Sequence, residues 1–138
     1  MVSRESVRIA FTYAALNGLD IEAADIQNAY LTAPTTEQFY IVCGPEFGSE
    51  NVGKKAIVTR ALYGMKSAGR DFRNHLRDCM EHMEYTPYMA DPDVWMRKAF
   101  KADGTEYYEF MLLYTDDCLN VSEDPRKGLM QLNKYFKL

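Results

Sequence analysis

Residues 110–121 read FMLLYTDDCLNV, with apolar segments on both sides of the adjacent acids Asp116 and Asp117. Apolar segments of this length favour β-strands, which would force the two acids into the turn between them. Neighbouring carboxylates repel each other unless a cation or hydrogen bonds compensate. Oxygen ligands suit Mg²⁺, which typically binds through one or two protein carboxylates. The stretch therefore predicts a hairpin that presents acids to a hard divalent cation, although a solvated turn is the common alternative.

A third acid, Asp25, follows the weakly alternating residues 19–24. We expect these residues to form a strand that carries Asp25 at its C-terminal end. Two neighbouring strands would then bring Asp25, Asp116 and Asp117 to one edge of a small sheet. Such a cluster would complete the oxygen ligands of a divalent cation site.

Three helices are predicted from apolar spacing and from capping residues. The first begins after Ser3, stops at Asn17-Gly18 and has an apolar stripe of Val7, Ala10, Phe11 and Ala14. The second covers residues 68–83, with an apolar stripe of Phe72, Leu76, Cys79, Met80 and Met83. The last begins at Asp124-Pro125, and its buried side is expected to hold Leu129, Leu132, Tyr135 and Phe136.

Strands are predicted at residues 94–99, 107–114 and 118–121, and a separate hairpin at residues 38–43 and 56–59. Together with the helices, these strands predict an α+β fold, in which a small antiparallel sheet packs against two or three helices.

The composition is that of one soluble globular domain: 138 residues, 47% hydrophobic and 26% charged. A net charge of −4 argues against a chain that binds nucleic acid by itself. Three scattered cysteines favour a reducing compartment over a disulfide framework. There is no signal peptide and no apolar stretch long enough for a membrane span, so no membrane partner is expected.

Four segments, taken in order, resemble the reverse transcriptase of copia-type LTR retrotransposons. Residues 25–31 (DIQNAYL) are similar to the family's D-x-x-x-A-[FY] motif, and residues 62–70 (LYGMKSAGR) to its S-L-Y-G-L-K-Q-A-P-R segment. Residues 90–95 (ADPDVW) resemble its S-D-P-C-L-[FY] stretch, and residues 114–117 (YTDD) its Y-V-D-D box. The chain departs from the pattern at Ser67 and Gly69, where the family has glutamine and proline, and at Thr115, where it has valine.

The resemblance implies a polymerase palm and an RNA-directed DNA polymerase that uses two Mg²⁺ ions, with Mn²⁺ as a substitute. Asp25 and Asp116 would be the principal metal ligands and Asp117 a supporting one, beside Tyr114 and Thr115 of the box. The nucleotide would be bound by two groups of residues: Ile26, Gln27, Asn28, Ala29 and Tyr30, and Tyr63, Gly64 and Lys66. Tyr30 is expected to be a steric gate that excludes the 2′-hydroxyl of a ribonucleotide.

The resemblance also implies partners: an RNA or DNA template with its primer, deoxynucleotide triphosphates, and the other segments of a pol polyprotein. Residues 1–138 would be one palm-type domain truncated at both ends, without most of the fingers and without the thumb, RNase H and integrase regions. Such an isolated segment is expected to be inactive. Its expected location is the cytoplasm, in a virus-like particle, or the nucleus.

Two alternatives remain open, and a third is disfavoured. The chain could be an inert relic or an assembly module of a retroelement polyprotein. His75, Cys79 and His82 share one helix face and could instead form a small metal-binding helical module. A glycosidase that uses Asp116 and Asp117 is disfavoured, because adjacent residues rarely face each other across a sugar.

Overall fold

The computed structural model describes residues 1–138, which divide into two compact units. The first unit comprises Met1–Gln27 and Leu76–Leu138, and the second comprises Asn28–His75. Helix α3 (Ala68–His82) therefore contributes its first half to the second unit and its second half to the first. No helix has both the length and the apolar character that a membrane crossing requires.

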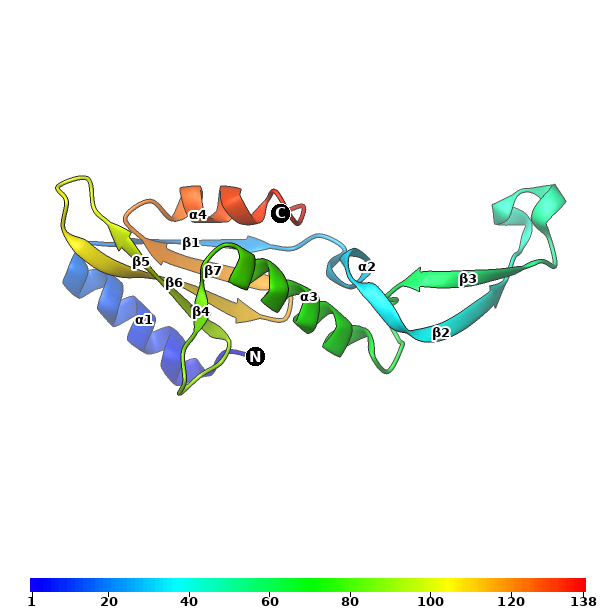
Figure 1. The fold of residues 1–138 in the computed structure, drawn as a ribbon, viewed down its shortest axis with the longest axis horizontal. Helices are drawn as coiled ribbons and strands as arrows, with labels where there is room; N and C mark the ends of the chain where they lie inside the picture. Colours follow the sequence, from blue (N-terminus) through cyan, green and yellow to red (C-terminus); the bar gives the residue numbers. More distant parts are fainter. The chain divides into compact units, whose positions relative to one another are not determined.

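The first unit is built on a five-stranded antiparallel sheet in the order β1-β7-β6-β5-β4 (Figure 1). Its strands are β1 (Asp20–Asp25), β4 (Thr86–Pro87), β5 (Val94–Phe100), β6 (Glu106–Tyr114) and β7 (Asp117–Ser122). Strands β6 and β7 form a hairpin with a two-residue turn, in which Tyr114 pairs with Asp117. Strand β1 is an edge strand and pairs only with β7.

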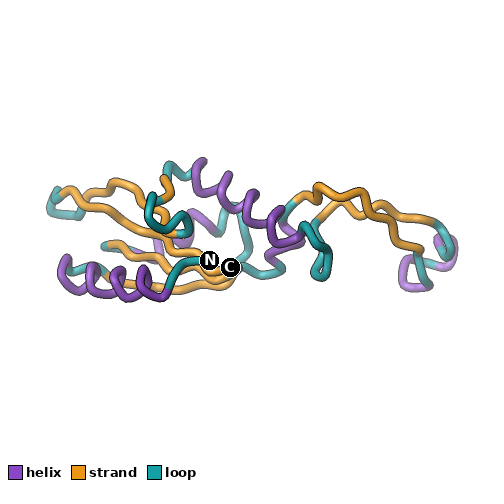
Figure 2. Tube along the Cα trace, turned by 90° about the horizontal axis from the view of Figure 1, so that it is seen from below, coloured by secondary structure: helices purple, strands orange, loops and turns teal.

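Helix α1 (Arg4–Asn17) runs along one face of this sheet (Figures 1 and 2). The Ser3 hydroxyl caps the helix by accepting a hydrogen bond from the Ser6 amide, and Gly18 ends it in the left-handed conformation. The core on this face combines residues of α1, residues that flank the helix and one residue from each of three strands: Val2, Ala10, Ala14, Leu19, Val94, Leu112 and Val121. Burial of these apolar side chains holds α1 against the sheet.

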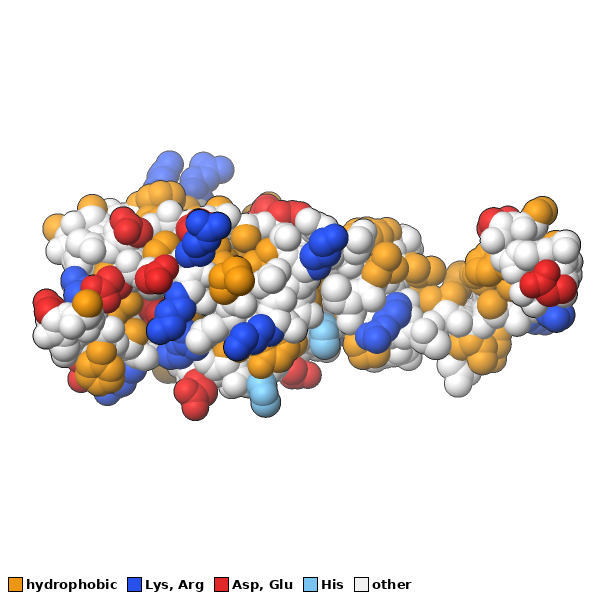
Figure 3. Space-filling model, turned by 90° about the horizontal axis from the view of Figure 1, so that it is seen from above, with side chains coloured by type: hydrophobic (Ala, Val, Ile, Leu, Met, Phe, Trp, Pro, Cys, Tyr) orange, Lys and Arg blue, Asp and Glu red, His pale blue; other side chains and the backbone are white.

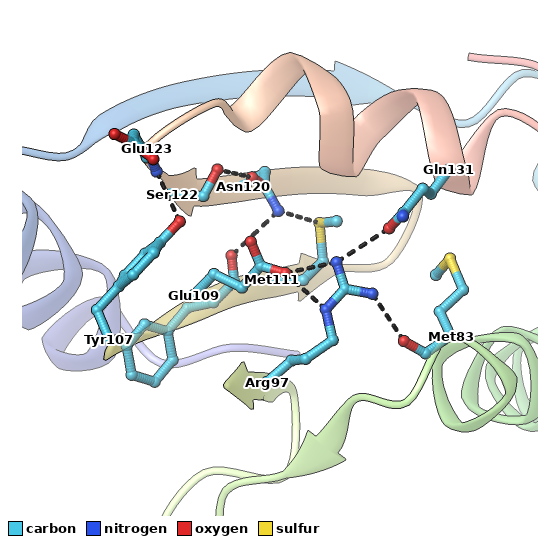
Figure 4. Close-up of polar contacts among 10 residues, drawn as sticks. Met83, Arg97, Tyr107, Glu109, Met111, Asn120, Ser122, Glu123 and Gln131 are labelled. Carbon is cyan, nitrogen blue, oxygen red and sulfur yellow. Dashed lines mark hydrogen bonds and ion pairs between the residues drawn. The ribbon is translucent and has the colours of Figure 1, made fainter. Parts of the chain in front are cut away.

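The opposite face of the sheet carries a polar network beneath helix α4 (Pro125–Leu132) (Figure 4). Arg97 of β5 forms an ion pair with Glu109 of β6 and donates hydrogen bonds to the Met83 carbonyl oxygen at 2.7 Å and to Gln131 Oε1 at 2.9 Å. The network therefore ties two strands to α4 and to the chain that follows α3. The Arg97 guanidinium also lies 4.2 Å from the centre of the Tyr85 ring, a cation–π contact.

The second unit contains a two-stranded antiparallel ribbon formed by β2 (Pro34–Val42) and β3 (Lys55–Arg60). Two short 3-10 helices, Pro45–Phe47 and Ser49–Asn51, connect the strands, and the four-residue helix α2 (Ala29–Thr32) precedes them. The space-filling view shows hydrophobic side chains exposed along the ribbon (Figure 3). Tyr40, Val42 and Ile57 are each more than half exposed.

The structure confirms the predicted α+β class, and every predicted strand and helix is present. The sequence did not predict α2 or β4, and β2 begins four residues earlier than expected, at Pro34. Two predicted core residues are wrong: Phe11 is 52% exposed and Tyr135 is 41% exposed. Phe11 lies off the buried stripe of α1, and Tyr135 falls beyond the last residue of α4 and so leaves the helical spacing.

Candidate active site

Three carboxylates converge at one end of the sheet of the first unit. Asp25 is the last residue of β1, Asp116 lies in the β6–β7 turn and Asp117 is the first residue of β7. One carboxylate oxygen from each residue lies within 4.8 Å of the others. Asp25 and Asp117 are exposed and Asp116 is half-buried, so the cluster is open to solvent. Oxygen atoms this close can share a hard divalent cation.

Strand pairing explains why residues so distant in sequence meet. In the β1–β7 ladder, Asp25 lies directly opposite Asp117. The next residue, Ile26, donates its amide to the Asp116 carbonyl oxygen at 2.8 Å, which joins the end of β1 to the hairpin turn. Like charges directly opposite each other on antiparallel strands are destabilising. The fold therefore keeps an unfavourable arrangement that a bound cation would relieve.

The negative charge of the cluster affects the pKa of the neighbouring buried thiol of Cys118. Cys118 follows Asp117 and is 1% exposed. Burial raises the pKa of this thiol to about 12, and the negative charges of Asp117, Asp25 and Asp116 add to the effect. Cys118 is therefore a neutral core residue at physiological pH.

The β6–β7 turn places Thr115 at a φ of 54°. Positive φ is rare for a β-branched residue, because its side chain crowds the backbone there. Replacing Thr115 with glycine should raise the free energy of unfolding by about 0.5–2 kcal/mol, since the strain removed exceeds the added entropy of the unfolded chain. Urea denaturation would measure the change.

Thr59→Gly is the matched control for this substitution, because Thr59 is an exposed residue in the extended β3 strand. Glycine in a strand interior should lower the stability. If both substitutions lowered it equally, Thr115 would not be strained.

The second unit holds the aromatic residues expected near the nucleotide. The Tyr30 ring of α2 stacks on the Tyr63 ring, with centroids 4.6 Å apart and planes inclined by 28°. Phe72 of α3 packs against Tyr30 at 5.9 Å and 49°. The Tyr30 ring thus contacts both a residue of the loop before α3 and a residue of α3 itself.

The other residues expected at the nucleotide belong to both units. Ile26 and Gln27 are in the first unit, and their amides already donate hydrogen bonds to the Asp116 and Lys137 carbonyl oxygens. Asn28 is left-handed at a φ of 52° and Ala29 is 1% exposed. In the loop before α3, Gly64 has a φ of 93° and Lys66 is exposed; both belong, with Asn28 and Ala29, to the second unit.

Gly69 lies in the first turn of α3, where glycine is a poor helix former. A Cβ at this position would meet only the Tyr30 hydroxyl, at 3.7 Å, which is an ordinary contact. Gly69→Ala should therefore raise the free energy of unfolding by about 0.5–1 kcal/mol, as measured by urea denaturation.

Gly18→Ala is the control, for which the opposite change in the free energy of unfolding is expected. A Cβ at Gly18 would meet no atom within 4 Å, but Gly18 has a φ of 60°, so alanine there should lower the stability. A loss of stability in Gly69→Ala would show that α3 does not hold this first turn in helical geometry.

Asp71 is a structural residue that sequence reasoning missed. Its carboxylate is buried and accepts hydrogen bonds from the Thr36 amide at 3.0 Å and the Thr36 hydroxyl at 2.8 Å. The Thr36 amide holds the pKa of Asp71 below its usual value, against the opposing effect of burial. Asp71 therefore anchors the start of α3 to β2, and because it lies off the apolar stripe of the helix, no sequence pattern indicated this role.

The alternative metal module on α3 gains no support from its residues. Cys79 is 7% exposed, and burial raises the pKa of its thiol. The ring of His82 packs edge-on against Tyr135, with centroids 6.0 Å apart. The cluster of potential metal ligands that the structure assembles is instead Asp25, Asp116 and Asp117.

An α+β fold with an acid cluster at the end of β1 and in the β6–β7 turn fits a nucleotidyl-transfer enzyme. The family model described as "Reverse transcriptase (RNA-dependent DNA polymerase)" matches residues 1–138. Because the match extends over the whole chain, the chain belongs to this reverse transcriptase family.

Two plant proteins are similar to the chain. It is 33% identical over 146 residues to the Retrovirus-related Pol polyprotein from transposon TNT 1-94 of Nicotiana tabacum, in a match that covers 100% of the chain. It is 25% identical over 126 residues, or 91% of the chain, to the Retrovirus-related Pol polyprotein from transposon RE1 of Arabidopsis thaliana. The matches cover only 10% and 8% of these two relatives. No solved structure matches the chain significantly.

Proposed function

We propose that the chain carries the catalytic carboxylates of an RNA-directed DNA polymerase of a copia-type retrotransposon. The reaction joins a deoxynucleotide to a primer 3′ end. In this proposal, two Mg²⁺ ions, which Mn²⁺ can replace, bind at Asp25 and Asp116, and Asp117 supports them. Held by these carboxylates, the metal would supply activation of the attacking primer oxygen and stabilisation of the negative charge on the leaving pyrophosphate.

The observation that carries this proposal is the approach of the three carboxylates to within 4.8 Å. A structural role for the cluster is disfavoured, because the three acids have no basic partner in an ion pair with them and like charges at this distance repel. Substrate phosphates would complete the coordination, because Mg²⁺ usually binds through few protein carboxylates.

The nucleotide is proposed to contact Asn28, Ala29, Tyr30, Tyr63, Gly64 and Lys66. Because the amides of Ile26 and Gln27 have partners within the first unit, we favour residues from Asn28 onward for the backbone contacts. Tyr30 is proposed to exclude ribonucleotides by occupying the space of a 2′-hydroxyl.

Turnover is proposed to require the other segments of the Pol polyprotein, a template and a primer, in a virus-like particle in the cytoplasm or in the nucleus. The net charge of −4 supports this dependence, because a strongly basic surface is needed to neutralise nucleic-acid phosphates. The second candidate is an inert relic or an assembly module, which the same family membership allows.

The test is a calorimetric titration of the chain with Mn²⁺, followed by dATP in the presence of Mn²⁺. The parent is expected to bind Mn²⁺ weakly and dATP only when Mn²⁺ is present. Asp25→Asn/Asp116→Asn should bind neither Mn²⁺ nor dATP. The control, Asp20→Asn/Glu22→Gln, removes two charges from the far end of the same strand and should bind as the parent does.

The outcomes separate the two candidates. Equal Mn²⁺ affinity in the parent and in Asp25→Asn/Asp116→Asn would contradict the metal site. Mn²⁺ binding that depends on the triad, without any dATP binding, would assign the chain to the inert relic or assembly module.

A further inference from the structure

We propose that Tyr63 is a positioning residue for Tyr30, so that the discrimination between deoxyribonucleotides and ribonucleotides depends on the stacked pair rather than on Tyr30 alone. The inference rests on the proposed function, in which Tyr30 faces the sugar. All of the contacts that carry it lie within the second unit.

The backbone around Tyr30 is a weak support for a side chain that must exclude a single hydroxyl group. Helix α2 has four residues, and its N-cap residue Asn28 is left-handed and makes no side-chain capping bond. Helices this short have little stability of their own. A ring attached to such an element needs contacts from other segments to stay in one position.

Two rings supply these contacts, and they do so differently. Phe72 is 2% exposed and supports Tyr30 from the buried side, at a tilted angle. Tyr63 is 60% exposed, yet it lies nearly parallel to Tyr30 with its centroid 4.6 Å away. Offset stacking at this separation is favourable beyond simple burial. Tyr63 is therefore the outer support of the ring, and without it Tyr30 could rotate toward solvent.

The contribution of Tyr63 comes from its ring. Stacking uses the face of the ring, so phenylalanine should replace tyrosine at this position, whereas alanine should not. Gly64, which follows at a φ of 93°, sets the direction in which the chain leaves the pair.

The test compares the dissociation constants of dATP and ATP, each in the presence of Mn²⁺, for five proteins, of which Tyr30→Ala should lose the preference for dATP. The parent should prefer dATP. Tyr63→Ala should reduce the preference by about two- to tenfold, the factor that corresponds to one aromatic stack. Tyr63→Phe should retain the preference of the parent. Tyr40→Ala removes a similarly exposed ring from the ribbon and should also leave it unchanged.

Three results would overturn the inference, and they are distinguishable. If Tyr63→Ala kept the full preference while Tyr30→Ala lost it, the positioning role would be wrong and the proposed function would stand. If Tyr63→Phe lost the preference as Tyr63→Ala did, the hydroxyl and not the stack would be responsible. If the parent bound neither nucleotide, the proposed function itself would fail, and the inference with it.

Discussion

Arg97→Met should lower the free energy of unfolding by about 3–5 kcal/mol, the largest effect of any substitution proposed for this chain. The reason is that the carboxylate of Glu109, whose side chain is only 12% exposed, would be left without its partner. The hydrogen bonds from Arg97 to the Met83 carbonyl and to Gln131 would also be lost (Figure 4). Since domains of this size have stabilities of about 5–15 kcal/mol, much of the protein would unfold under mild conditions.

Two further variants test whether the loss of stability comes from breaking the buried ion pair of Arg97 and Glu109. Arg97→Met/Glu109→Leu removes both charges and should recover most of the lost stability, because no unpaired charge remains. Lys98→Met breaks the exposed ion pair with Glu106 on the same two strands, and its urea midpoint should stay close to that of the parent. Equal losses in Arg97→Met and Lys98→Met would show that Arg97 and Glu109 are solvated in solution.

The effect of Asp25→Asn/Asp116→Asn on the stability of the protein should change sign when metal is added. In the presence of a chelator, which removes free metal, Asp25→Asn/Asp116→Asn should be more stable than the parent by about 1 kcal/mol. The substitutions remove the repulsion among largely solvated carboxylates. In Mn²⁺ at about 100 times its dissociation constant, the parent should gain about 2.7 kcal/mol and the variant nothing. The order of the two thermal midpoints should therefore reverse on addition of Mn²⁺.

The reversal distinguishes a metal site from a solvated turn. Asp20→Asn/Glu22→Gln should show the same response to Mn²⁺ as the parent, since its changes lie away from the cluster. A cluster without a metal function would leave the order of midpoints unchanged by Mn²⁺.

The sequence predicted the acid cluster because its placement follows from local rules. Apolar strands on both sides of Asp116 and Asp117 leave only a turn for the acids, and the hairpin forms there. Asp25 joins them because β1 pairs with β7 in a register that sets it opposite Asp117. That pairing joins residues far apart in the sequence. In the sequence, only the position of Asp25 at the end of a predicted strand suggested that it would meet the other two acids.

Other features could not be predicted because they depend on tertiary contacts. The stack of Tyr30 on Tyr63 joins two segments that no local pattern connects. The Arg97 network joins two strands, α4 and the chain that follows α3, and the polar residues Arg97, Glu109 and Gln131 each have the pattern of a surface residue. Strand β4 has two residues and exists only because β5 offers a partner. Phe11 was misplaced because the helical spacing gives the stripe but not its width.

The most direct test of a metal-dependent polymerase centre is the anomalous diffraction of Mn²⁺ in crystals of the chain grown with Mn²⁺ and dATP. We predict anomalous peaks in direct contact with the carboxylate oxygens of Asp25 and Asp116, and with the phosphates of the nucleotide. Ordered Mn²⁺ at other sites, with none at these carboxylates, would contradict the assignment of the cluster as the catalytic centre.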